Sequence, residues 1–444
     1  MDCNIVCPSC GRLHNAAIAR IVNKTGGLSQ LGAFLSERFT GGHILLVFDA
    51  HTLQAAGAAV EAAAQTANVT FSRFCYGGAD HLVPNERTVS SMLEAVQAER
   101  PGCLIAVGSG VVNDICRYVA SKRGIPYIGV MTAASMDGYA STVAPLILGG
   151  LKTTLPAVMP LALIGDPDLY GAAPPEMAGA GFGDIMGKIN ALADWRLARD
   201  LFGEYHCETI AASVQNTIDA CIANAEHIAA RKTGGLAVLM DALVQSGLAI
   251  SYVGHSRPAS GAEHHVAHFF EMESLFANET PALHGAAVGV ATLAVLRLRR
   301  LLAEIMPDFD AAIAAAKDFS IDDYTQMLRR VFRMAADGIL AAEMKSKRPF
   351  PAQTVARIEA ARAKWPLVQA HLKKILIDES SLLSLLHTVR CPASPKELGI
   401  SREVFTSAIL HAKEIRGRYT VLQLAGDLGL LPQLAETLAH AERW

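Results

Sequence analysis

Three histidines and one aspartate lie at predicted turns and helix starts beyond residue 180. The segment SRPASGAEHHVAH (256–268) places His264 and His268 four residues apart, on one face of a predicted helix. His284 precedes a very apolar helix, and Asp184 follows the glycine-rich stretch GAGFG (179–183). One carboxylate with two or three imidazoles suits a divalent metal that keeps an open coordination position. The alternative is that Asp184 only caps its helix and that the histidines are packed or lie at the surface.

A second group of candidate residues forms a glycine turn near residue 110. The stretch GSGVVND (108–114) follows the apolar run CLIAVG (103–108) and opens a predicted helix. Glycines there let backbone N–H groups approach a pyrophosphate, whose negative charge is favoured at a helix N-terminus. The third glycine of the GxGxxG fingerprint is absent, and many such turns only reverse the chain. The turn therefore predicts a dinucleotide site only in combination with other features.

Two acidic residues end or follow other predicted strands. Asp49 closes the apolar run HILLVFD (43–49), where a carboxylate can bind a ribose or cap the next helix. Asp137 lies in TAASMDGYAS (132–141), directly after the run IPYIGVMT (125–132). Small hydroxyl residues at the carboxyl end of a strand can contact a cofactor closely. Asp137 beside Gly138 is also typical of an ordinary turn.

Two cations near these motifs suit a phosphorylated substrate. Arg257 lies seven residues before His264, and Lys188 lies four after Asp184, one turn along the same predicted helix. A phosphate dianion needs cations or helix N-termini. The alternative is that Arg257 pairs with Glu263 and that Lys188 is solvated.

Cysteines cluster at the start of the chain. Cys3, Cys7, Cys10 and His14 form a C-x3-C-x2-C-x3-H run, which has the residue types of a zinc site. No second CxxC completes the site, so the alternative is a terminal strand or turn with free thiols. The total of nine cysteines is odd, which favours free thiols in a reducing cytoplasm over a disulfide framework.

The elements that would position these residues fall into two groups. Up to about residue 165, short apolar runs alternate with helical stretches, as in a parallel α/β sheet. The run 141–156 contains a Gly-Gly turn and predicts a hairpin. Beyond about residue 170 the chain is rich in Ala and Leu, with almost no strand signal. We therefore expect a nicotinamide-binding α/β domain at 1–170 and a helical metal- and substrate-binding domain at 171–444, joined by the linker Ala172–Pro175.

Composition excludes several classes of protein. The chain has 444 residues, is 51% hydrophobic and 18% charged, and has a formal net charge of -3. These values argue against disorder and against a nucleic-acid-binding tract. The longest weakly polar run identified, Gly285–Leu296, is shorter than the ~20 residues that cross a bilayer. We therefore expect no membrane span.

The motifs GSGVVND, TAASMDGYAS, AGFGD, SRPASGAEH and LHG together resemble the glycerol-1-phosphate dehydrogenases. That family belongs to the iron-containing alcohol dehydrogenase and dehydroquinate synthase-like superfamily. The resemblance runs from about Cys7 to about Leu431, includes the cysteine run, and is closer to the bacterial branch. It implies the dehydroquinate synthase-like fold and the reversible, NAD(P)H-dependent reduction of dihydroxyacetone phosphate to sn-glycerol 1-phosphate, a step of phospholipid biosynthesis. His255 departs from the pattern, which has a smaller residue before Ser256.

The resemblance also implies roles for individual residues. Asp184, His264 and His284 would bind one divalent ion, either nickel, zinc or iron. Asp137 and His268 would contact the substrate and act in catalysis, and Asp184 could touch it as well. The cofactor would be NAD(H), with NADP(H) as the second choice. The residues lining it would be Asp49, Gly108, Gly110, Val111, Val112, Asn113, Asp114, Thr132, Ala133, Ala134, Ser135 and Ser141.

Three other functions are compatible with parts of this pattern. A glycerol or polyol dehydrogenase would share the metal and cofactor residues. A dehydroquinate synthase-like cyclase would typically offer a glutamate in place of Asp184, with several more cations. A non-catalytic binding protein would have no need of three metal ligands. We therefore expect a cytoplasmic dehydrogenase of a small phosphorylated triose, with no nucleic-acid partner, assembled as a homodimer or higher homo-oligomer.

Overall fold

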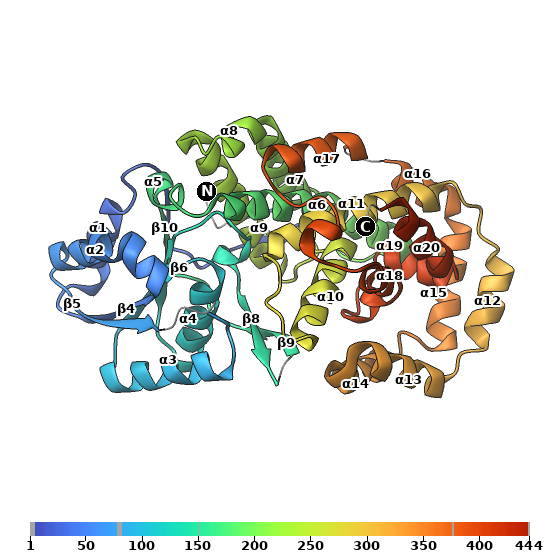
Figure 1. Cartoon of the computed structure of the whole chain (residues 1–444), viewed down its shortest axis with the longest axis horizontal. Coiled ribbons are helices and arrows are strands. Elements are labelled where there is room, and N and C mark those ends of the chain that lie inside the picture. The colour runs from blue at the N-terminus through green and yellow to red at the C-terminus, as the bar shows by residue number, and fades with distance from the viewer. Residues whose placement is uncertain (1–4, 78–81, 150, 375–376, 443–444) are drawn as a thin grey trace. The chain divides into compact units, whose positions relative to one another are not determined.

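The computed structural model describes residues 5–77, 82–149, 151–374 and 377–442 (Figure 1). The chain forms two compact units. The first comprises Met1–Ile185, Ala212–Ser256 and Thr388–Arg390, and the second Met186–Ala211, Arg257–His387 and Cys391–Trp444. Helices α6 (Pro175–Phe202) and α7 (Glu208–Ala223) each run unbroken from one unit into the other.

The first unit is built on a six-stranded sheet in the order β3-β10-β7-β6-β4-β5, in which every pairing is parallel. Its strands are β3 (Arg20–Asn23), β4 (His43–Asp49), β5 (Thr70–Tyr76), β6 (Cys103–Gly108), β7 (Tyr127–Met131) and β10 (Ala162–Gly165). The carboxyl ends of β4, β6 and β7 are therefore neighbours. The loops that follow them carry the predicted cofactor residues.

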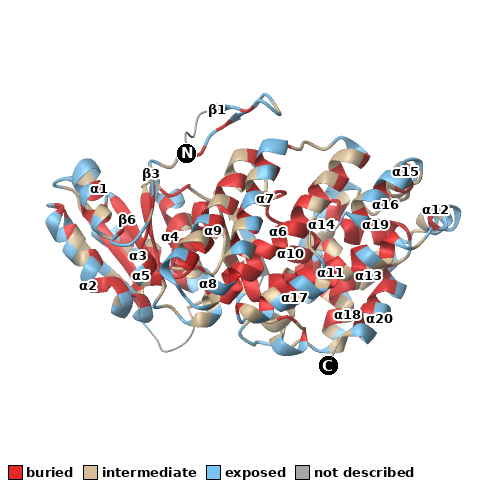
Figure 2. Ribbon diagram, turned by 90° about the horizontal axis from the view of Figure 1, so that it is seen from above, coloured by how far each residue is buried: buried red, intermediate tan, exposed pale blue. Residues whose placement is uncertain are grey.

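Helices cover both faces of this sheet, so its central strands are buried on both sides (Figure 2). Leu46 of β4 belongs to a core formed with α1 (Ser29–Phe39) and α2 (Ala50–Thr66). Its neighbour Val47 belongs to a second core, formed with α3 (Glu86–Glu99) and α4 (Gly110–Arg123). Two-sided burial explains why these strands read as continuous apolar runs.

The remaining elements in the described part of the first unit are two hairpins, three 3-10 or short helices and one long helix. They are β1 (Ile5–Val6) with β2 (Leu13–His14), β8 (Val143–Leu148) with β9 (Leu151–Pro156), η1 (Gly138–Ala140), α5 (Pro167–Tyr170), α8 (Ala225–Ala229) and α9 (Thr233–Val253).

The second unit is helical throughout the part that the structure describes. Its helices, besides the shared α6 and α7, are α10 (Ala262–Phe276), α11 (His284–Ala303), α12 (Phe309–Lys317), α13 (Ile321–Phe332), η2 (Arg333–Ala335), α14 (Ala336–Ser346), α15 (Pro351–Ala363), α16 (Trp365–Lys373), α17 (Glu379–Thr388), η3 (Lys396–Leu398), α18 (Arg402–His411), η4 (Ala412–Glu414), α19 (Val421–Asp427) and α20 (Leu431–Ala441).

The predicted fold class is confirmed: a parallel Rossmann-like sheet is followed by a helical remainder. The predicted strands at 43–49 and 103–108 and the hairpin at 141–156 are present. Helix α3 begins at Glu86, where Asn85 and Thr88 form a capping box. The predicted boundary at residue 170 differs from the compact units, because α9 packs on β3 and η1 and so belongs with the sheet. The predicted linker Ala172–Pro175 follows α5 and ends at Pro175, the first residue of α6.

Helix α9 is longer and more apolar than the run considered from the sequence. Its 21 residues reach a mean hydropathy of 1.6 in the most apolar window, so it is long and apolar enough to cross a bilayer. However, 61% of that window is buried inside the protein, as in the core helix of a globular unit. Helix α9 thus gives only weak evidence of a membrane span.

We predict that Leu46→Ala destabilises the sheet strongly. Leu46 is completely buried, so the substitution leaves a cavity and should cost about 2–5 kcal/mol. Ile21→Ala, on the edge strand β3 and 38% exposed, is the control and should cost less than about 1 kcal/mol. Urea unfolding followed by circular dichroism measures both. Equal midpoints for the two variants would contradict the two-sided core.

Candidate active site

The start of α10 is held by the buried carboxylate of Asp194 on α6. Its Oδ2 accepts from the backbone N–H of Ala262 at 2.8 Å, and its Oδ1 accepts from that of Val421, the first residue of α19, at 2.9 Å. Arg299 of α11 donates to the same Oδ1. Burial raises the pKa of Asp194, and the Arg299 guanidinium opposes that shift. One side chain thus connects four helices at the point where α10 begins.

Three histidines from α10 and α11 form a cluster. The ring centroids of His264 and His284 lie 5.4 Å apart, as do those of His268 and His284. The rings of His268 and His284 are stacked, with an interplanar angle of 21°. The spacing of four residues on α10 therefore does place His264 and His268 on one face, as predicted, and α11 brings His284 to it.

Two glutamates orient these imidazoles. His264 Nδ1 lies 2.7 Å from Glu263 Oε1, and His284 Nδ1 lies 2.7 Å from Glu271 Oε1. The other oxygen of Glu271 lies 3.0 Å from His268 Nδ1. In the tautomer in which each Nδ1–H donates to its carboxylate, each Nε2 presents a lone pair, as in the carboxylate–histidine pairs that support metal sites.

The sequence did not lead us to either glutamate as the partner of a histidine. Glu263 directly precedes His264, and Glu271 is three residues after His268 on the same helical face. The second spacing is a signal that could have indicated Glu271 as a partner.

Asp184 lies on α6, one turn before Gly187. A Cβ atom at Gly187 would lie 3.6 Å from His264 Cε1, so this face of α6 lies against His264. Asp184, His264 and His284 each offer one ligand atom, and these atoms all lie within 4.8 Å of one another. Asp184 is completely buried, and its Oδ2 also accepts from the backbone N–H of Asp137 at 3.0 Å. An O/N/N donor set of this kind fits a divalent transition metal.

A second group of possible ligands, His268, Glu271 and His284, shares one histidine with the first. In that group both carboxylate oxygens of Glu271 are already engaged with imidazole Nδ1 atoms. This arrangement suits a residue that orients ligands rather than one that binds the ion itself.

The two predicted phosphate cations have other surroundings than expected. Arg257 donates to Glu204 through Nε at 2.7 Å and through an Nη at 2.5 Å, and also to the Tyr419 carbonyl at 2.6 Å. The alternative pairing with Glu263 is thus replaced by a pair with Glu204. Lys188 is completely buried, so it is not a solvated lysine.

Sequence reasoning also missed Arg416. Its guanidinium lies 3.2 Å from His268 Nε2 and so places a cation against the histidine cluster. Burial lowers the pKa of Arg416, and the carboxylate of Glu271 opposes that shift. Arg418, two residues later, donates to the Ser260 carbonyl at 3.3 Å. The sequence signal was the RGR triplet at 416–418, which lies far from the other motifs.

The glycine turn joins β6 to α4 as predicted. A Cβ atom at Gly108 would lie 2.5 Å from Val112 Cβ, so glycine is required for close packing of the helix on the strand. Gly110 is the first residue of α4, whose first backbone N–H groups have no acceptor within the helix. Asp114 forms an ion pair with the buried Arg117 at 3.1 Å.

Asn113, in the same turn, is an unsatisfied polar group. It is 1% exposed, and neither polar atom of its side chain has a hydrogen-bond partner in the described part of the chain. A buried amide without partners costs about 1–3 kcal/mol. Together with the open N-terminus of α4, it fits a site that a polar ligand such as a dinucleotide would complete.

The loop after β7 is packed closely against α6. Thr132, Ala133 and Ala134 are buried, and a Cβ atom at Gly181 would lie 2.1 Å from the Ala134 carbonyl oxygen. The Asp137 carboxylate accepts from Ser246 Oγ at 2.9 Å. Its backbone N–H contacts Asp184, so Asp137 does more than form a turn.

Two other predicted cofactor residues have local partners. The Oδ1 of Asp49 accepts from the backbone N–H of Thr52 at 2.8 Å, which makes Asp49 the N-cap of α2. The Ser141 hydroxyl accepts from the backbone N–H of Val143 at 3.1 Å and closes its own turn. Asp49 therefore caps α2, as the alternative interpretation expected. It also remains the last residue of β4, the position from which it would face the ribose.

The chain is similar to several known proteins. Residues 22–174 match the family model described as iron-containing alcohol dehydrogenase. A glycerol-1-phosphate dehydrogenase [NAD(P)+] of Bacillus licheniformis is 34% identical over 357 residues, which cover 80% of this chain and 75% of the relative. The Bacillus subtilis protein of the same name is 34% identical over 88% of this chain and 87% of its own.

Solved structures show the same fold. The iron-containing alcohol dehydrogenase of Thermococcus thioreducens superposes with a TM-score of 0.63 at 14% identity, covering 96% of this chain and 99% of its own. A sequence identity of 14% supports only a shared fold.

Proposed function

The chain belongs to the glycerol-1-phosphate dehydrogenases, and on this premise we propose that it transfers a hydride between a nicotinamide cofactor and dihydroxyacetone phosphate. The reaction reversibly forms sn-glycerol 1-phosphate. It requires a metal site, a cofactor site and a phosphate site, and we infer the residues of each below.

The observation that carries the proposal is the cluster of Asp184, His264 and His284. Its ligand atoms lie within 4.8 Å of one another, and each imidazole has a carboxylate on its Nδ1. We infer that these three residues bind one divalent ion, for which nickel, zinc and iron are all suitable. Glu263 and Glu271 orient the two histidines from behind.

We infer that the cofactor lies at the carboxyl ends of β4, β6 and β7. The glycine turn from Gly108 to Asp114 would hold its pyrophosphate at the N-terminus of α4. Thr132–Ser135 and Ser141 would line the nicotinamide side. Asp49 at the end of β4 would face the ribose, so we propose NAD(H) as the preferred cofactor and NADP(H) as the second.

The chain's own residues would handle the substrate and its proton. When bound, the divalent ion polarises the ketone oxygen and the nicotinamide exchanges the hydride. We propose that His268 relays the proton, because Glu271 holds its Nδ1 and Nε2 would become available for proton exchange when the Arg416 guanidinium beside it binds the phosphate. Asp137, held by Ser246, would contact the substrate hydroxyl.

We infer that Arg416 binds the phosphate. It lies 3.2 Å from His268, whereas the guanidinium of Arg257 is paired with Glu204. Arg257 is therefore the second candidate. Lys188, buried one turn after Asp184 on α6, would add a further positive charge.

The other functions have less support. The matching relatives described above are named as dehydrogenases, which does not favour a dehydroquinate synthase-like cyclase. A plain glycerol dehydrogenase would have no use for Arg416 beside the histidine cluster. The family resemblance further supports a cytoplasmic enzyme of phospholipid biosynthesis that assembles as a homodimer or higher homo-oligomer.

We predict that His264→Ala removes one equivalent of divalent metal per chain and abolishes turnover of dihydroxyacetone phosphate. The variant lacks one of three ligands, and the remaining two hold the ion weakly. Elemental analysis and an NADH oxidation assay measure the two effects. His51→Ala, at an exposed position of α2, is the control and should keep both. Unchanged metal content in His264→Ala would refute the ligand assignment.

We predict that Arg416→Ala raises the KM for dihydroxyacetone phosphate at least ~10-fold, equivalent to ~1.4 kcal/mol. Its residual activity on unphosphorylated dihydroxyacetone should stay nearly unchanged, and Arg416→Lys should recover part of the loss. Arg257→Ala is measured beside it. A larger rise in KM for Arg257→Ala than for Arg416→Ala would show that Arg257, and not Arg416, is the main phosphate-binding residue.

We predict a higher kcat/KM with NADH than with NADPH, because a carboxylate at Asp49 repels a 2′-phosphate. Asp49→Ser should narrow the preference. Thr52→Ala, which removes the other half of the capping box, controls for loss of the cap and should leave the preference in place. Equal efficiency of the wild-type enzyme with both cofactors would overturn the role of Asp49.

A further inference from the structure

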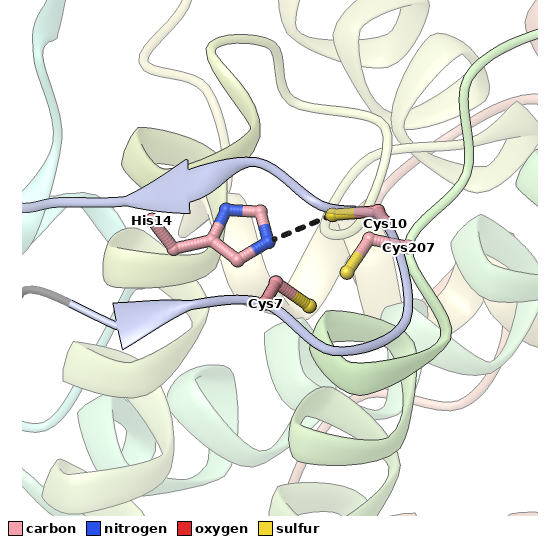
Figure 3. A group of neighbouring side chains, drawn as sticks. All are labelled: Cys7, Cys10, His14 and Cys207. Atoms are coloured by element: carbon pink, nitrogen blue, oxygen red, sulfur yellow. Dashed lines mark hydrogen bonds between the residues drawn. The ribbon is translucent and has the colours of Figure 1, made fainter.

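Three cysteines and a histidine meet at the N-terminal hairpin. Cys7, Cys10, His14 and Cys207 each offer one ligand atom, and these atoms all lie within 4.8 Å of one another (Figure 3). Cys3, the first cysteine of the sequence motif, lies outside the described residues. Among the described residues, the fourth donor of the group is Cys207, from a distant part of the chain. None of the residues proposed for the hydride transfer belongs to this cluster.

The hairpin turn brings the first two thiols together. The backbone N–H of Cys7 donates to the Arg12 carbonyl at 2.9 Å, and that of Gly11 donates to the Cys7 carbonyl at 2.8 Å. Gly11 has a φ of +68°, which residues other than glycine rarely adopt. This tight turn directs the thiols of Cys7 and Cys10 toward the same point in Figure 3.

His14 is oriented by the backbone of α9. Its Nδ1 lies 3.0 Å from the Tyr252 carbonyl oxygen, which only accepts, so Nδ1 carries the proton and donates. Its Nε2 lies 3.4 Å from Cys10 Sγ. A histidine with a carbonyl on one nitrogen presents the lone pair of the other to a metal, the arrangement common among metal-bound histidines.

Cys207 is fixed by the start of α7. Its carbonyl accepts from the backbone N–H of Ala211 at 2.9 Å, and its side chain is completely buried. Helix α7 continues unbroken into the first unit, which contains the hairpin. Cys7 and His14 are also buried, at 3% and 8% exposure.

We propose that Cys7, Cys10, His14 and Cys207 bind a structural zinc ion. Zinc takes four ligands in a tetrahedron, with Zn–S of about 2.3 Å and Zn–N of about 2.0 Å, which places neighbouring ligand atoms about 3.5–3.8 Å apart. The ligand atoms of the four residues all lie within 4.8 Å of one another, which is compatible with these tetrahedral separations. Soft thiolates favour zinc over hard ions such as magnesium and calcium, which prefer oxygen ligands.

Binding of zinc to the four residues releases protons from the thiols. Three thiols lose their protons to solvent, His14 stays neutral, and the zinc with three thiolates carries one net negative charge. All four coordination positions are filled by the protein, so the ion activates no water and serves only the fold. It joins the N-terminal hairpin to a residue almost two hundred positions later, and closing so long a loop stabilises the folded chain.

The test is the metal content of the anaerobically purified full-length chain. We expect two equivalents of divalent metal per chain, of which one is zinc that survives in His264→Ala. Cys207→Ser should lose that zinc and keep the other ion. Cys221→Ser is the matched control, because Cys221 is also completely buried and lies within α7, the helix that Cys207 directly precedes. It should keep both ions.

Cobalt substitution gives a second readout, independent of activity. The wild-type protein and Cys221→Ser should show sulfur-to-cobalt charge-transfer absorption, and Cys207→Ser should show most of it lost. If Cys207→Ser does not fold, Cys10→Ser in the hairpin takes its place, with the same expected loss. Zinc content unchanged in these variants would overturn the proposal. A disulfide among the three cysteines of the wild-type protein, detected by thiol titration, would overturn it as well.

Discussion

The buried carboxylate of Asp194 is the interaction on which the histidine cluster depends. It accepts from the first backbone N–H of α10, from that of α19 and from Arg299 of α11, while its own residue belongs to α6. Removing a carboxylate from water costs several kcal/mol unless such partners replace the lost hydration. The helices that carry Asp184, His264 and His284 therefore meet where this one charge is satisfied.

Carboxylates also hold the candidate histidine ligands of the metal site. Glu263 and Glu271 each hold an imidazole by its Nδ1, and Glu271 holds two. The N-terminal hairpin uses a backbone carbonyl of Tyr252 in the same role for His14. In both places a partner on one nitrogen selects the tautomer that leaves the other nitrogen available.

The sheet contributes differently, through the ends of its strands. Parallel strands buried on both faces deliver their carboxyl ends to one edge, and the loops after β4, β6 and β7 therefore lie beside one another. Close packing is required at Gly108 and at Gly181, where any side chain would meet the neighbouring backbone or Val112. The unsatisfied amide of Asn113 lies in the same region. A rigid sheet with small residues at its edge is a suitable base for a nucleotide.

The metal and cofactor residues were proposed from the family resemblance. Local patterns in the sequence predicted the strands, the glycine turn and the face shared by His264 and His268. These depend on periodicity, turn residues and capping, which act over a few positions. Cys207, Arg416 and Glu271 were identified only in the tertiary structure, as was the pairing of Arg257 with Glu204. Arg416 contacts a partner 148 positions away, and the thiol of Cys207 lies within 4.8 Å of ligand atoms up to 200 positions away, so packing between distant elements sets their positions. No pattern within a single helix or turn contains that information.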